Sequence, residues 1–210
     1  MTPRMRPTWL ALAAIVVATF CGLHAMTHGF SAVTSDGARQ LAIAESPRQL
    51  PAIGLVDSQG RKTDLRAVVA DHPYTVVALV YTQCTSICLV MASSESFLQA
   101  RLRDAGIEEQ VGLLTLSFDP ARDTPEVLAQ YARRIKADSV TWTIATVADH
   151  DDLERLLDVF DVVVIPDGNG EYIHNGALFL VDGDGRMFEA LAPDAADLAF
   201  ERLAALVRSP

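Results

Sequence analysis

The sequence predicts an α/β domain in which strands and helices alternate and the chain finishes with antiparallel strands. Two uncharged, largely apolar runs carry this prediction, at residues 74–81 (YTVVALVY) and 111–118 (VGLLTLSF). Both have the composition of strands that are buried on both faces of a sheet. Between them, residues 86–104 place apolar side chains at helical spacing, and Ala105-Gly106 ends the helix. This succession is typical of a sheet covered by helices.

The first 28 residues are expected to form a signal or anchor segment. Arg4 and Arg6 precede the uncharged run WLALAAIVVATFCGL at residues 9–23, the order found in export signals and membrane anchors. A helix of that run spans about 22 Å, less than the roughly 30 Å hydrocarbon core, so its length fits either interpretation. The residues LHA at 23–25 match the small-x-small cleavage rule poorly because Leu23 is large. We therefore expect an uncleaved anchor in the inner (cytoplasmic) membrane, with the domain on the periplasmic or extracytoplasmic side.

Residues 29–51 are polar and lack periodicity, which predicts an irregular tether before a domain at 52–208. At the start of that domain, a short hairpin is expected over residues 53–65, because Ser58-Gln59-Gly60 separates two extended runs.

After the two buried strands, Thr124 and Pro125 supply an N-cap and a first helical position, so a helix is expected from there. The remaining elements are a strand at 142–146, a helix at 149–160, a short strand at 162–165, a hairpin of 177–181 with 187–190, and a last helix at 195–207.

Charge and cysteine content exclude two classes of protein. Lys and Arg total 17 against 27 Asp and Glu, a net charge of −10, so no basic surface is available for a phosphate backbone. We expect no nucleic-acid partner. Three cysteines are too few for a disulfide scaffold in a chain of 210 residues. A chemical role for the cysteines is therefore favoured over structural cross-linking.

Cys84 and Cys88 follow the first buried strand directly, at the start of the next helix. Open α/β sheets place their sites at such strand ends. If helical geometry holds from Cys84 or just beyond it, a separation of four residues puts both sulfurs on one helix face, where unpaired backbone N–H groups favour thiolate over thiol. The pair predicts a redox site, a soft-metal site or both. The alternative is that the two cysteines are small buried hydrophobic residues or form one inert disulfide.

Two thiolates with at most one imidazole suit Cu(I) better than structural zinc, which normally takes four ligands.

The histidines offer a third ligand. His72 and His150 occupy a loop and a helix start, where solvated or capping roles are the default. His174 lies between the loop at 167–170 and the final hairpin, and a flexible hinge there could carry its ring towards the cysteines. Spacing alone does not assign it, because a lone histidine is more often without a ligand role.

Taken together, three motifs resemble the SCO/SenC family of membrane-anchored, thioredoxin-like copper proteins, which assist assembly of the dinuclear copper centre of cytochrome c oxidase. The motifs are Tyr81-Thr82-Gln83-Cys84 to Cys88, the segment 117–125 (SFDPARDTP), and His174 followed by 177–182 (ALFLVD). The resemblance implies a thioredoxin-like three-layer sandwich with an N-terminal β-hairpin.

The same resemblance implies a site and a partner. Cys84, Cys88 and His174 match the family's copper ligands, for Cu(I) and also Cu(II), and Asp119 matches an acidic residue near the metal. The implied partner is the copper-bearing subunit of cytochrome c oxidase or another exported copper protein. The alternative function is a thiol-disulfide oxidoreductase acting on an exported client. A peroxidase has no specific motif here.

The cysteine motif departs from the family at two positions. The family usually has Pro directly after each cysteine, whereas this chain has Thr85 and Leu89. Without Pro the loop is less constrained and gains N–H groups that could bond a thiolate. Metal affinity and reduction potential are therefore expected to differ from those of the family.

Overall fold

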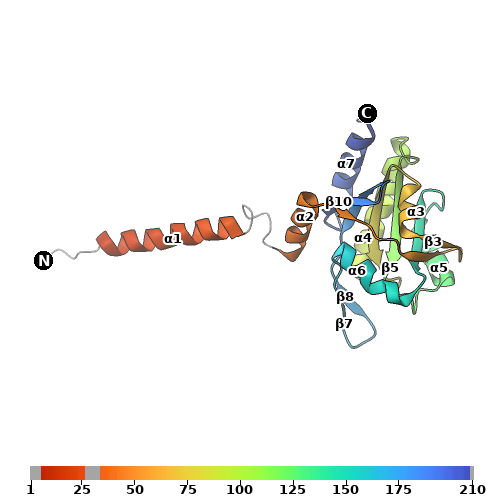
Figure 1. Cartoon of the computed structure of the whole chain (residues 1–210), viewed down its shortest axis with the longest axis horizontal. Helices are drawn as coiled ribbons and strands as arrows, with labels where there is room; N and C mark the ends of the chain where they lie inside the picture. The colour runs from red at the N-terminus through yellow and green to blue at the C-terminus, as the bar shows by residue number, and fades with distance from the viewer. Residues whose placement is uncertain (1–5, 27–33, 209–210) are drawn as a thin grey trace. The chain divides into compact units, whose positions relative to one another are not determined.

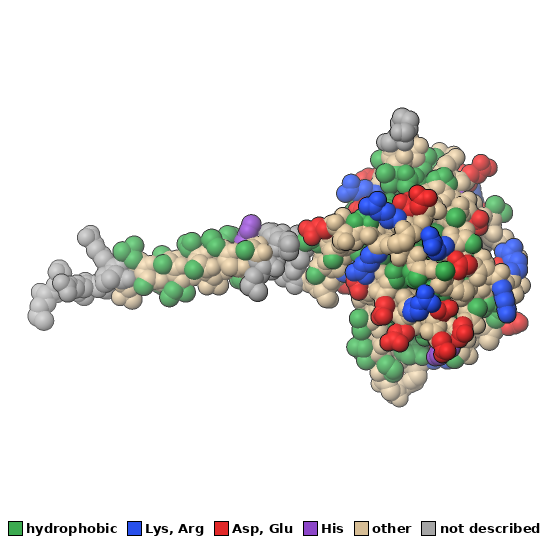
Figure 2. Space-filling view, in the orientation of Figure 1, with side chains coloured by type: hydrophobic (Ala, Val, Ile, Leu, Met, Phe, Trp, Pro, Cys, Tyr) green, Lys and Arg blue, Asp and Glu red, His purple; other side chains and the backbone are tan. Residues whose placement is uncertain are grey.

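A computed structural model describes residues 6–26 and 34–208, and the chain divides into two compact units, Met1–Ala42 and Ile43–Pro210. The first unit contains helix α1 (Arg6–Met26), in which Thr8–Ala25 has a mean hydropathy of 1.8. Apolar side chains cover its surface in Figure 2. Its 21 residues extend about 31 Å, close to the roughly 30 Å hydrocarbon core. Membrane anchors and signal sequences share these features, so the uncleaved anchor stays a prediction.

The second unit is built on an eight-stranded sheet with the order β1-β10-β9-β4-β5-β6-β2-β3 (Figure 1). The central strands β4, β5 and β6 are parallel, and β9 and β10 close one side in antiparallel pairing. The strand bounds are β1 Arg48–Gln49, β2 Gly54–Asp57, β3 Lys62–Asp64, β4 Tyr74–Val80, β5 Val111–Ser117, β6 Trp142–Val147, β9 Leu178–Asp182 and β10 Arg186–Leu191. The predicted alternation, the β2–β3 hairpin and the antiparallel finish are confirmed.

Helices cover the sheet on both faces. They are α3 (Leu65–Ala70), α4 (Ile87–Asp104), α5 (Pro125–Ile135), α6 (Leu153–Phe160) and α7 (Ala196–Arg208), with a 3₁₀ turn at His150–Asp152. Helix α5 begins where Thr124 and Pro125 predict, and it ends at Ile135, directly before Lys136, which has a left-handed φ of 58°. Every residue of β5 is buried, as expected for a strand enclosed between two helical layers.

The irregular conformation expected over residues 29–51 is wrong from residue 35 onwards, and residues 29–33 lie outside the described residues. Helix α2 (Ser35–Glu45) and strand β1 occupy this segment, and β1 pairs with β10. Ile43 and Leu50 are buried in the core of the second unit, which therefore begins before residue 52. The segment is polar overall, so its composition does not reveal that Ile43 and Leu50 are buried and stabilise an ordered backbone.

A second, two-stranded sheet lies apart from the main one (Figure 1). The short strand expected at 162–165 is β7 (Val164–Pro166), and it pairs with β8 (Tyr172–His174), which the sequence did not predict. Gly168 and Gly170 have left-handed φ angles of 83° and 90° in the connecting turn. This β7–β8 hairpin places His174 at the end of a strand rather than in a free loop.

Candidate metal centre

Three donor atoms of the predicted site converge. The sulfurs of Cys84 and Cys88 and a ring nitrogen of His174 all lie within 4.8 Å of one another. His174 Nε2 is 3.3 Å from Cys88 Sγ and 3.9 Å from Cys84 Sγ. Both cysteines are buried and free, at 6% and 3% exposure. The hinge motion considered for His174 is not needed to bring the ring to the sulfurs.

The end of β4 and the start of α4 set the positions of the two cysteines. Helix α4 begins at Ile87, so Cys84 lies in the preceding loop and Cys88 in the first helical turn. The Cys84 N–H donates to the Tyr81 carbonyl at 3.2 Å, which closes a turn directly after the strand. The Cys88 N–H then points at the Cys84 sulfur, 3.4 Å away. A first-turn N–H that has no partner within the helix thus faces the Cys84 sulfur, an arrangement that favours the thiolate form.

The two thiols have opposite electrostatic environments. Burial alone would raise the pKa of Cys84, but hydrogen bonds from the Cys88 thiol and from the backbone N–H groups of Ser86 and Cys88 lower the pKa below its ordinary 9.0. Burial raises the pKa of Cys88 well above that value, and the hydrogen bond to Cys84 adds to the effect. Negative charge on Asp123 acts in the same direction. Cys84 is therefore the thiol that forms thiolate at the lower pH.

The His174 ring is held in its neutral form. Burial lowers the pKa of its imidazole, so the ring is uncharged near neutral pH. Its Nδ1 lies 2.9 Å from the Asn175 carbonyl oxygen, which only accepts hydrogen bonds, so this geometry assigns the proton to Nδ1. The lone pair on Nε2 consequently faces the two sulfurs. The ring also packs against Phe118, with centroids 4.9 Å apart.

Two side chains fasten the β7–β8 hairpin to the strand ends. The Tyr81 hydroxyl donates to Glu171 at 2.7 Å and accepts from the Tyr172 N–H at 3.3 Å. Arg122 donates to the Gly170 carbonyl at 2.5 Å, and its guanidinium lies 5.0 Å from the Tyr172 ring centroid. The hairpin that carries His174 is thus tied to the chain segments at the ends of β4 and β5.

Asp119 is the acidic residue that the family resemblance places near the metal. Its carboxylate is buried and accepts a hydrogen bond from Arg122, and its N–H donates to Ser117 Oγ at 3.1 Å. These contacts connect Asp119 to the arginine that fastens the hairpin. They do not reach the sulfurs, so its role near copper stays a prediction.

Asp123 is the acidic residue that sequence reasoning missed. It is fully buried and accepts hydrogen bonds from the Thr82 N–H at 2.9 Å and from Ser117 Oγ at 2.5 Å. Its bond to Thr82 fixes the loop that leads to Cys84. The sequence signal that could have pointed to Asp123 was its place in segment 117–125, four residues after Asp119. This motif also has a purely structural interpretation, so it did not single out Asp123.

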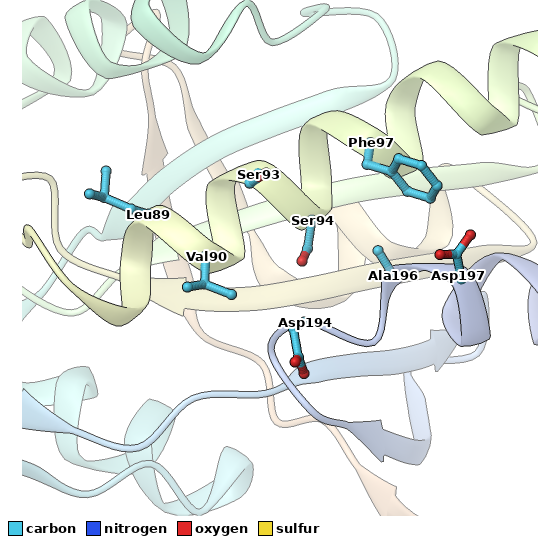
Figure 3. A pocket seen from close by; sticks show the side chains of 8 residues that line it. All are labelled: Leu89, Val90, Ser93, Ser94, Phe97, Asp194, Ala196 and Asp197. Atoms are coloured by element: carbon cyan, nitrogen blue, oxygen red, sulfur yellow. The ribbon is translucent and has the colours of Figure 1, made fainter.

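Leu89 has a backbone N–H where the family's Pro has none, but this N–H does not donate to a thiolate. Its N–H donates to the Ser86 carbonyl at 3.1 Å, a bond that Pro could not make. Its side chain is 59% exposed and borders two hollows. One hollow adjoins Cys84, and the other lies between α4 and the start of α7 (Figure 3).

Two thiols and a neutral imidazole, set at the end of a central strand in a thioredoxin-like α/β sandwich, define a class of thiol- and metal-handling proteins. The SCO1/SenC family model matches residues 48–208, and the chain belongs to this family. The predicted family and the thioredoxin-like fold with its N-terminal hairpin are thereby confirmed.

Individual relatives agree with this assignment. The chain is 28% identical to a SCO1 protein homolog of Bacillus subtilis over 112 residues, which cover 52% of this chain and 57% of that protein. It is 26% identical to a candidate copper-binding protein of Stutzerimonas stutzeri, over 85% of each chain. The crystal structure of Arabidopsis thaliana ScoI with copper bound superposes with a TM-score of 0.67 at 13% identity, covering 78% of this chain and all of that one.

Proposed function

We propose that this protein is a copper metallochaperone. Cys84, Cys88 and His174 hold the copper ion as cargo and release it to an exported copper protein by ligand exchange. The proposed recipient is the dinuclear copper centre of cytochrome c oxidase. The observation that carries the proposal is the convergence of two sulfurs and one imidazole nitrogen within 4.8 Å.

The donor set fits Cu(I). Thiolates are soft ligands, and an imidazole with its free nitrogen towards them completes a set of three. Among the residues that the structure describes, no fourth His, Cys, Asp or Glu joins this cluster, whereas structural zinc normally takes four protein ligands. The copper named for the Stutzerimonas and Arabidopsis relatives supports the same ion.

An anaerobic Cu(I) titration with a competing chelator tests the proposal. Reduced, metal-free protein should take up about one equivalent, and Cys84→Ala, Cys88→Ala and His174→Ala should each weaken binding, since each removes a donor. His150→Ala, which changes an exposed histidine outside the cluster, is the matched control. Equal affinity in all four variants and the unchanged protein would exclude this site.

A second function is favoured by the two free thiols, whose sulfurs lie within 4.8 Å of each other, and by their opposite pKa shifts. The protein would reduce a disulfide on an exported client, with Cys84 attacking and Cys88 resolving the mixed disulfide. Metal-free protein should then reduce a disulfide in the oxidase copper-bearing subunit, and Cys84→Ser should abolish the reaction. Activity that survives this substitution would argue against the assignment.

We further propose that α1 is an uncleaved anchor in the inner membrane, with the domain facing the periplasm. Its length and apolar surface support this placement. Mass spectrometry of protein purified from membranes tests it, because an anchor retains residues 1–28 and a cleaved signal does not. Recovery of a soluble form that lacks this segment would favour a signal peptide.

A further inference from the structure

A cavity of about 510 Å³ borders the cysteine turn, between the loop after β4 and helix α5. Cys84 forms part of its wall, and Cys88 is not among the residues that line it. The volume falls within the range of about 300–1,000 Å³ that is usual for small-molecule pockets. Of the two cysteines, Cys84 is therefore the one that a small molecule in this cavity would contact.

Arg134 places a positive charge on the same wall. Its Nη2 donates to the Thr82 carbonyl at 3.0 Å, and its guanidinium lies 5.1 Å from the Tyr131 ring centroid. Within residues 6–26 and 34–208, no carboxylate forms an ion pair with Arg134. A guanidinium that is positioned but not neutralised is a binding group for a carboxylate.

The negative net charge of the whole protein repels anions. The chain has a net charge of −10, and the hollow between α4 and α7 is bordered by Asp194 and Asp197 (Figure 3). A preference for an anionic compound near Cys84 therefore has to come from a local group. Arg134 is that group, and Gln83 and Gln130 on the same wall add hydrogen-bonding side chains for the remainder of a polar ligand.

We propose that this cavity binds a low-molecular-weight thiol or disulfide that bears carboxylates, with a carboxylate at Arg134 and the sulfur at Cys84. The proposal rests on the thiol-disulfide function suggested above for the pair and does not require copper. Exchange with this small compound would set the oxidation state of Cys84 and Cys88, and so decide whether the thiols that metal binding requires are present.

The reaction balances as an exchange between two dithiol/disulfide couples. Cys84 thiolate attacks one sulfur of the small disulfide, forms a mixed disulfide and releases one thiolate, which takes a proton from solvent. Cys88 loses its proton to solvent and attacks the Cys84 sulfur, which releases the second small thiolate and leaves the Cys84–Cys88 disulfide. The protein is oxidised by two electrons and the small disulfide is reduced to two thiols. In reverse, two small thiols regenerate the reduced pair.

The test compares three disulfides as oxidants of the reduced, metal-free whole chain in detergent. Oxidised glutathione is anionic, bis(2-hydroxyethyl) disulfide is neutral and cystamine is cationic. Arg134→Gln should lower the glutathione rate, relative to the neutral probe, by about two- to fivefold, the usual size for one exposed ionic contact. Arg134→Lys should retain part of the preference because it retains the charge.

Arg133→Gln is the matched control, since it removes an equal charge from the neighbouring, exposed position outside the cavity wall. It should leave the relative rates unchanged. In Cys88→Ser, the trapped glutathione should be found on Cys84 by peptide mass spectrometry. Equal effects of the two arginine variants, an equal loss with all three probes, or attachment to another cysteine would overturn the subsite. Reaction with none of the probes would overturn the redox function as well, and copper titration would be unaffected by either result.

Discussion

His174 Nε2 lies 3.3 Å from the sulfur of Cys88, although 86 positions separate the two residues in the chain. The cysteines belong to the junction of β4 with α4, whereas the imidazole comes from the β7–β8 hairpin. The site is therefore complete only while the hairpin stays docked. Contacts that fasten the hairpin should control copper binding without touching the metal.

Arg122→Gln tests this dependence. The substitution removes the cation beside the buried Asp119 and weakens the link to the Gly170 carbonyl. Loss of a charged partner by a buried carboxylate costs about 1–3 kcal/mol of unfolding free energy. Cu(I) affinity should fall severalfold as well, because undocked conformers lack the imidazole. Denaturant unfolding and chelator competition measure the two effects.

Arg155→Gln is the control for that experiment, since it breaks an exposed ion pair with Asp152 that includes none of the three site residues. Its stability change should stay within about 1 kcal/mol. Its copper affinity should equal that of the unchanged protein. If Arg122→Gln loses stability but keeps full affinity, the hairpin contacts do not govern the site.

The reactivity of the two thiols should differ with pH. Cys84 has a lowered pKa and Cys88 a raised one, so Cys84 forms thiolate at lower pH. Iodoacetamide labelling of reduced, metal-free protein, followed by peptide mass spectrometry, should give a midpoint below the ordinary 9.0 for Cys84 and above it for Cys88. Coincident midpoints would contradict the asymmetry on which the attacking role of Cys84 depends.

The sequence predicted the central sheet well because parallel strands that are buried on both faces consist of continuous apolar runs, such as residues 74–81. It placed Cys84 and Cys88 correctly because both are close to one strand end. It did not predict β8, whose three residues have no periodicity and depend on pairing with β7. The position of His174 is a product of that tertiary contact, so only the family resemblance could raise it above the other histidines.

Gly176 tests how tightly the histidine segment packs against helix α4. A Cβ at this position would lie 2.9 Å from Met91 Sδ and 3.2 Å from Ile87 Cδ1. Met91 is fully buried and has little room to move, so Gly176→Ala should cost about 1–3 kcal/mol through overpacking. Copper affinity should fall because the strain acts on the first turns of α4, next to Cys88.

Gly54→Ala is the matched control for this change, since its added Cβ would meet Ala148 at an ordinary 3.7 Å. Neither glycine has a positive φ, so both substitutions are judged on packing alone. Thermal unfolding and Cu(I) competition of the two variants decide the matter. Similar behaviour of both variants would show that the contact with Met91 relaxes without cost.

Glu95 should make the stability of the domain fall as pH rises. It is fully buried in α4, accepts from Thr115 at 2.7 Å, and its other oxygen has no hydrogen-bond partner among the described residues. Burial raises its pKa from 4.5 to about 8, against a smaller opposing effect of Thr115. Because the folded state binds the proton more tightly, the stabilisation is complete below the unfolded pKa and is lost as pH rises through about 8.

Glu95→Gln keeps a similar shape and an acceptor for Thr115 but cannot ionise. Relative to the unchanged protein, its unfolding free energy should therefore improve by about 2–4 kcal/mol between about pH 5 and pH 9. Glu126→Gln is the control: this exposed carboxyl has a pKa below 4.5, so it is ionised throughout that interval and contributes no slope there. Urea unfolding across the interval measures the difference. Parallel curves for Glu95→Gln and the unchanged protein would mean that Glu95 does not hold its proton in the folded state.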